Sequence, residues 1–170
     1  MSAHRGIATV ASALMVSFLV LSAMEPEFFL LHFYESLIYL AIVLMLFYFE
    51  DKWAYMIGIV APAAWLILAY GVGLLGGAMR QVSKLMRAQR PTNEVSVMVV
   101  ILTILSVLLI SFCAYRWKRQ YAGLGRGRTT FLVSLAIVIA YNAILVVWFW
   151  RTIPQAISTG NLISRLMQGR

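Results

Sequence analysis

One acidic side chain lies deep inside an apolar stretch, and no other residue of this chain is better placed to do chemistry. Five of the six acidic residues stand at turns or at the ends of apolar runs, whereas Glu35 stands nine residues after Pro26 within such a run. At a helical rise of about 1.5 Å per residue, nine residues correspond to about 13 Å. That depth is close to the middle of a bilayer core about 30 Å thick. A carboxyl group there is costly, which makes it a candidate for function.

Two further polar residues share the helix face of Glu35. His32 precedes it by three residues and Tyr39 follows it by four, and both spacings bring side chains together on a helix. Glu35 would then accept a proton that His32 or Tyr39 passes on, in a proton relay or at a site for a quinone headgroup or small solute. The alternative is structural, since interhelical hydrogen bonds in membranes contribute about 0.6 kcal/mol each.

Polar residues at a similar depth occur in three other apolar runs. Tyr70, Thr103 and Asn142 each lie eight residues from the end of a run, or about 12 Å in by helical rise. We therefore expect a polar layer around Glu35, in which Asn142 would orient a polar group.

The composition excludes a water-soluble domain. Hydrophobic residues make up 62% of the 170 residues and charged residues 12%, against about 45–50% and about 25% in soluble domains. Five apolar runs are long enough to cross a bilayer as helices: 7–24, 26–49, 53–78, 95–115 and 131–150. The sequence predicts an all-α polytopic membrane protein, a single bundle of about five transmembrane helices with a basic interfacial segment. Connections this short leave no room for a soluble catalytic or nucleic-acid-binding domain.

The third run contains the residues that could shape helix packing. Ala69, Gly73 and Gly77 recur at a spacing of four, which is typical of a helix-packing surface in membranes. Pro62 stands inside the same run and predicts a kink. The stripe indicates contact with other membrane subunits or with a second copy of the chain.

Basic residues flank the runs and indicate contact with anionic lipid headgroups rather than nucleic acid, despite the net charge of +8. We assign that contact to six residues: Arg80, Lys84, Arg87, Arg116, Lys118 and Arg119. The segment after Ala78 and the tail 151–170 both have an amphipathic, basic pattern typical of interfacial helices. The 14 Lys and Arg residues divide seven and seven between the two faces, so the positive-inside rule gives no orientation. The charges that flank the first run favour an N-terminus on the inner side of the membrane.

The sequence lacks the motifs of the common cofactor and metal sites. It contains no HExxH, no Cys-x-x-Cys and no P-loop. We therefore expect no metal site, and the sequence favours a protein without enzymatic activity. The two histidines, His4 and His32, fall near opposite faces, so one chain would not ligate a haem between them. We expect no cofactor, with a quinone or haem as the least favoured alternatives.

These features favour a non-catalytic accessory or structural subunit of a larger membrane assembly, in a membrane of the bacterial inner type. The first alternative is a small proton-coupled transporter built around Glu35, and the second is a quinone- or haem-binding anchor. The first run resembles a signal peptide, but Leu21 stands where a cleavage site needs a small residue. We therefore expect residues 1–23 to stay as a helix.

Overall fold

In a computed structural model of the protein, residues 2–48, 51–71, 73–87, 94–121 and 127–150 are described. Within them the chain is helical and no strand occurs, which confirms the all-α prediction. The elements are α1 (Ser2–Met24), the 3₁₀ helix η1 (Pro26–Phe28), α2 (Phe29–Tyr48), α3 (Asp51–Gly71), α4 (Leu74–Met86), α5 (Glu94–Tyr121) and α6 (Gly127–Trp150). The chain divides into two units, Met1–Leu135 and Ala136–Arg170. The predicted tail helix in 151–170 lies outside the described residues.

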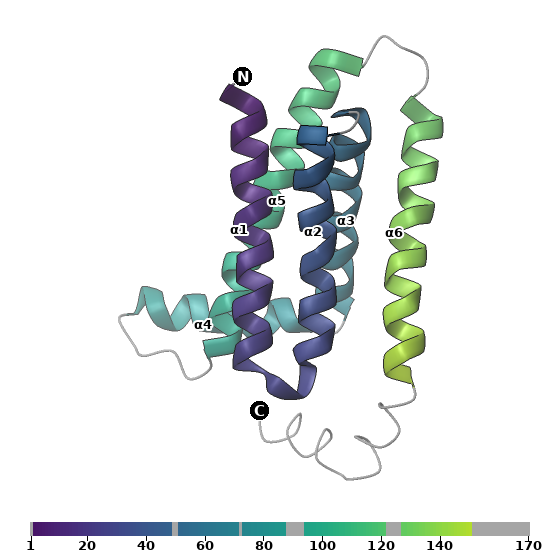
Figure 1. Ribbon diagram of the computed structural model, residues 1–170. Helices are drawn as coiled ribbons and strands as arrows, with labels where there is room; N and C mark the ends of the chain where they lie inside the picture. Colours follow the sequence, from purple (N-terminus) through teal and green to yellow (C-terminus); the bar gives the residue numbers. More distant parts are fainter. Residues whose placement is uncertain (1, 49–50, 72, 88–93, 122–126, 151–170) are drawn as a thin grey trace. The chain divides into compact units, whose positions relative to one another are not determined.

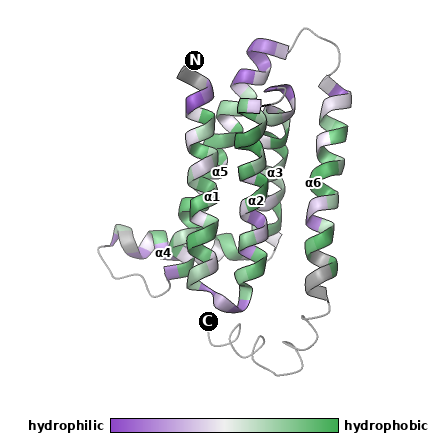
Figure 2. Cartoon of the chain, in the orientation of Figure 1, coloured by the Kyte–Doolittle hydropathy of each residue, from purple (hydrophilic) through white to green (hydrophobic). Residues whose placement is uncertain are grey.

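Five of the described helices are long and apolar enough to cross a membrane, in agreement with the five predicted spans. Their apolar windows have the following bounds: His4–Met24, Pro26–Tyr48, Asp51–Gly71, Glu94–Tyr121 and Gly127–Leu145. Most of the length of the long helices is apolar, and polar residues interrupt it at a few places, among them the lower half of α2 (Figure 2). Large apolar side chains such as Leu44, Ile104 and Val107 are exposed. This surface fits a membrane-embedded protein, because lipid replaces water around it.

In the first unit, α1, α2, α3 and α5 run alongside one another, and α4 lies across one end of them (Figure 1). The helices α1, α2 and α5 bury residues mostly at a spacing of three and four, the period of one helix face. On α1 the buried residues include Ile7, Ala11, Leu14, Phe18 and Leu21. On α5 they are Val99, Leu102, Ser106, Leu109 and Cys113. The same period on α2 buries Ser36, Tyr39, Ile42 and Leu46.

The helix α3 is the most enclosed of the five, with 50% of its apolar window buried. Its approach to α5 depends on Gly58, since a Cβ atom there would lie 2.7 Å from the Cys113 Sγ atom. Pro62 is buried inside α3, and the helix continues past it to Gly71. Glycine at position 58 therefore sets how closely α3 and α5 pack.

The predicted span 53–78 differs from the structure, which divides it into two helices. The helix α3 ends at Gly71, and α4 begins at Leu74. Gly73 between them has a φ of +82°, a left-handed conformation that glycine adopts without a steric cost. Its N–H donates to the Tyr70 carbonyl at 3.0 Å. The apolar pattern is continuous through this turn, which is why hydrophobicity alone does not reveal it. The helix that carries the basic amphipathic segment, α4, therefore begins before Met79. A second difference concerns α5, which continues through its basic run to Tyr121.

Candidate functional site

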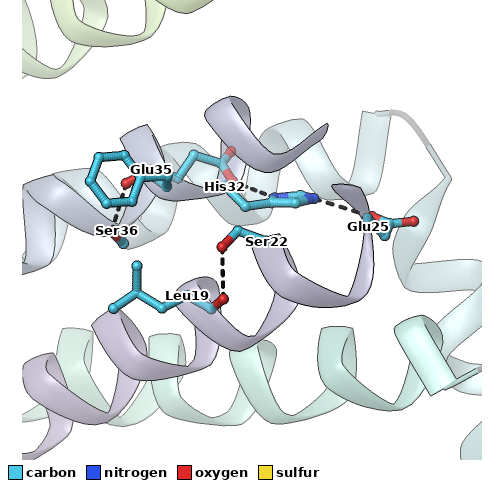
Figure 3. A network of polar contacts seen from close by, with 7 residues as sticks. Leu19, Ser22, Glu25, His32, Glu35 and Ser36 are labelled. Carbon is cyan, nitrogen blue, oxygen red and sulfur yellow. Dashed lines mark hydrogen bonds and ion pairs between the residues drawn. The ribbon is translucent and has the colours of Figure 1, made fainter. Parts of the chain in front are cut away.

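An ion-paired triad lies where α1 turns into α2. The His32 ring is held between two carboxylates, with Nδ1 3.2 Å from Glu35 Oε2 and Nε2 3.1 Å from Glu25 Oε2. The ring lies between the two acids (Figure 3). Both imidazole nitrogens are thus engaged by carboxylate oxygens. We call Glu25, His32 and Glu35 the triad.

Local structure explains why these three residues meet. His32 and Glu35 are three residues apart on α2 and share a helix face. Glu25 directly follows α1, and its N–H donates to the Leu21 carbonyl at 3.0 Å. Pro26 then begins η1, and the Phe28 N–H donates to the Glu25 carbonyl at 2.9 Å. This tight reversal returns the Glu25 side chain to a residue seven positions later.

The three side chains of the triad differ in exposure. The side chain of Glu25 is 32% exposed, that of Glu35 18% and that of His32 12%. The Phe28 ring covers the imidazole edge-on, with the ring centroids 6.5 Å apart. The triad therefore joins a partly exposed carboxylate to a more enclosed one through one imidazole.

The triad lines a cavity of about 260 Å³ inside the first unit. Its lining comes from α1, α2, α3, α4 and α5 together with Glu25, and apart from the triad it is apolar. The apolar lining residues are Leu21, Leu31, Trp65, Leu68, Ala69, Leu74, Val95 and Val99. The Trp65 ring packs edge-on against Phe18 at 5.7 Å between centroids. The site is thus an apolar cavity with one acidic, polar wall.

The residues expected to form a polar layer with Glu35 have other surroundings. Tyr39 is buried and stacks on Phe18, with 5.5 Å between ring centroids. Tyr70 is 78% exposed. The Thr103 hydroxyl donates to the Val99 carbonyl of its own helix at 2.7 Å. The Asn142 amide does the same to the Val138 carbonyl at 2.8 Å, within the second unit. Within the expected set, His32 and Glu35 contact each other directly.

The predicted packing stripe is divided between two helices and a turn. Ala69 is buried in α3, where it lines the cavity. Gly73 forms the turn, and Gly77 lies in α4. A Cβ at position 77 would lie 3.6 Å from Ser96 Oγ, so this glycine approaches α5 of the same chain. The three residues therefore do not form one helix face.

The residues assigned to lipid headgroups lie at both ends of the first unit. Arg80 and Arg87 are exposed in and just after α4, and Lys84 is half-buried. Lys118 and Arg119 are exposed near the end of α5, where the Arg119 guanidinium lies 4.9 Å from the Tyr115 ring centroid. Arg116 differs, since its Nε atom is buried without a hydrogen-bond partner among the described residues. Contact with lipid stays a prediction for all six.

A second polar cluster lies at the other end of the bundle. His4 Nε2 is 3.7 Å from Asp51 Oδ2, and the buried Tyr55 hydroxyl lies 3.4 Å from the same nitrogen. These contacts join the beginning of α1 to the beginning of α3. His4 therefore lies at the beginning of α1 and His32 near the turn at its other end, each beside a carboxylate.

Sequence reasoning missed Glu25 and Trp65 as parts of the site. Glu25 reads as a turn residue, and its only signal is the shortness of the turn, which keeps it near the first residues of α2. Trp65 reads as an apolar core residue, because its place beside the triad depends on how α3 packs. Comparison with known protein families, with curated proteins and with solved structures finds no match to this chain.

Proposed function

We propose that the chain is a small proton-coupled carrier of a membrane of the bacterial inner type, in which the triad takes up and releases the coupled proton. One observation carries the proposal: His32 is held between two carboxylates at the wall of a cavity inside an apolar bundle. Chains of carboxylates and imidazoles within membranes are typical of proton relays. Structural hydrogen bonding would not require that the same groups line a cavity.

The chemistry of the triad suits this task. An imidazole can accept a proton at one ring nitrogen and release one from the other. Glu25 is the most exposed member and would exchange protons with the interface. Glu35 would exchange them with the cavity. A solute that enters the cavity would then compete with the proton for Glu35.

The alternatives from the sequence are less well supported by these contacts. The haem or quinone anchor needs His32 as a ligand or a donor, whereas both of its nitrogens already face carboxylates. The accessory-subunit interpretation, which the sequence favours, rests in part on the glycine stripe, and the turn at Gly73 divides that stripe. Native mass spectrometry in mild detergent tests that alternative, since unrelated subunits in a fixed ratio would support it.

Proteoliposomes test the carrier. Purified protein is reconstituted with the pH dye pyranine inside, and benzyltrimethylammonium, benzylsulfonate, glucose and glycine are added outside in turn. We expect at least one solute to change the internal pH with the wild type and not with Glu35→Gln. Glu27→Gln removes an exposed acid from the same turn that does not line the cavity, so it should retain the change. Absence of any solute-dependent pH change, or an equal change with Glu35→Gln, would contradict the proposal.

A further inference from the structure

The cavity beside the triad has an excess of negative charge. Two of its lining residues are carboxylates and one is an imidazole, and neither Lys nor Arg lines it. When both carboxylates are ionised, the triad carries a charge of −1 with His32 protonated and −2 with His32 neutral. The apolar walls screen this charge less than bulk water does, although the triad side chains keep 12–32% of their surface exposed. A ligand that brings a positive charge would compensate the triad, whereas an anion would be repelled.

The rest of the lining indicates that the cation is organic. Eight of the eleven lining residues are apolar, and they cannot replace the water shell of a small inorganic ion. Across the residues that the structure covers, no group of three His, Cys, Asp or Glu side chains is placed to hold a metal ion. An apolar body attached to a weakly hydrated cationic centre suits walls of this kind.

Trp65 supplies a second attraction for such a ligand. Its indole lines the same cavity as Glu35, and the faces of indole rings attract cations, quaternary ammonium groups in particular. The edge-on contact with Phe18 holds the ring in place. A carboxylate and an aromatic ring therefore line one cavity of about 260 Å³.

We infer that the cavity binds lipophilic organic cations, with Glu25 and Glu35 as the counter-charges and Trp65 as the aromatic wall. This inference rests on the proposed function, since it names the class of solute that the triad would exchange for protons. The apolar lining residues Leu68 and Leu74 are both exposed, so apolar side chains border the opening of the cavity.

Equilibrium dialysis of radiolabelled probes against the purified full chain in nanodiscs tests the inference. The probes are benzyltrimethylammonium and benzylsulfonate, which share the benzyl group and are opposite in charge, with empty nanodiscs to subtract partition into lipid. We expect saturable binding of the cation alone. Equal binding of the two probes, or no saturable binding of the cation, would overturn the inference, and this comparison needs no variant.

Variants then locate the binding. We expect Glu35→Gln to weaken cation binding at least tenfold and Trp65→Leu about threefold to tenfold, in keeping with cation–π contributions of up to about 2 kcal/mol. Glu27→Gln is the matched control and should bind as the wild type does. An equal loss in Glu27→Gln and Glu35→Gln would show general surface attraction and would overturn the assignment to the cavity.

Proton release separates this inference from the proposed function. In weak buffer with a pH dye, a coupled site releases protons as benzyltrimethylammonium binds. Saturable cation binding without proton release would overturn the carrier and uphold the inference. If glucose, glycine or benzylsulfonate drove proton movement in proteoliposomes and the cation did not, the carrier would be upheld and the inference overturned.

Discussion

His32 is the central residue of the triad, because each of its ring nitrogens faces a different carboxylate. Hydrogen bonds to charged groups contribute about 1.5–3 kcal/mol each when they are well enclosed. Here the side chains remain 12–32% exposed, so solvent screening reduces the value. The imidazole therefore stabilises the turn between α1 and α2 as well as the cavity wall.

The energetic link between His32 and Glu35 can be measured. We expect His32→Ala to lower the free energy of unfolding by about 1–3 kcal/mol, because it leaves two partly buried carboxylates without their shared partner. Glu35→Gln alone should lower the free energy of unfolding by less than His32→Ala does. The double variant should lower it by less than the sum of the two single losses. SDS titration in mixed micelles gives these values. Additive losses would mean that the two side chains do not interact.

The sequence predicts half of this site. The depth of Glu35 and the spacing of His32 are local properties that a helix period reveals. Glu25 was not predicted, because its contact depends on how Pro26 reverses the chain. Tyr70 and Thr103 were expected at the depth of Glu35, but depth leaves the direction around the helix axis undetermined. Tyr70 is exposed, and Thr103 bonds to its own backbone.

At the scale of the elements, the turn between α3 and α4 depends on one glycine. Gly73→Ala should lower the free energy of unfolding by about 1–2 kcal/mol, because a side chain is disfavoured at positive φ. Gly71→Ala is the matched control, since it lies within α3 and nothing lies within 4 Å of its added Cβ. We expect the control to be as stable as the wild type or slightly more so. Equal effects in an SDS titration would contradict the left-handed turn.

The contact between α3 and α5 gives a second test at this scale. Gly58→Ala should destabilise by about 1–3 kcal/mol, because the new methyl group overlaps the Cys113 sulfur. Cys113→Ala removes that sulfur, so the double variant should recover part of the loss. Gly76→Ala, with nothing within 4 Å of its added Cβ, is the control. If the double variant had a lower free energy of unfolding than Gly58→Ala alone, α3 and α5 would not be in contact at this pair.

The sequence predicts the helices better than their ends. Five apolar spans follow from hydrophobicity alone, since each must match the thickness of a bilayer. The division at Gly73 depends on backbone conformation within a run that stays apolar on both sides, so hydrophobicity carries no signal for it. The basic run after Tyr115 reads as a stop, although Lys and Arg are good helix formers and α5 continues through them.

For the whole molecule, the order of the helices sets which segments share a side of the membrane. The turn at Glu27 and the end of α4 at Met86 should lie on one side, and Lys52 on the other. Single cysteines at these positions, tested with a membrane-impermeant maleimide on intact cells and on inverted vesicles, report the side. Cys113 is buried and should give little background. Labelling of Lys52→Cys and Met86→Cys from the same side would contradict the arrangement.

The position of Leu74 has a mechanical consequence. It is the first residue of α4, directly after the turn at Gly73, and the only α4 residue among those that line the cavity. The 13 residues of α4 extend about 20 Å at 1.5 Å per residue. The helix also packs against α5, since a Cβ at Gly77 would lie 3.6 Å from Ser96 Oγ, so its far end at Met86 is held apart from the cavity wall at Leu74. A force applied at Met86 would therefore reach the cavity only through the first turn of α4, at Leu74.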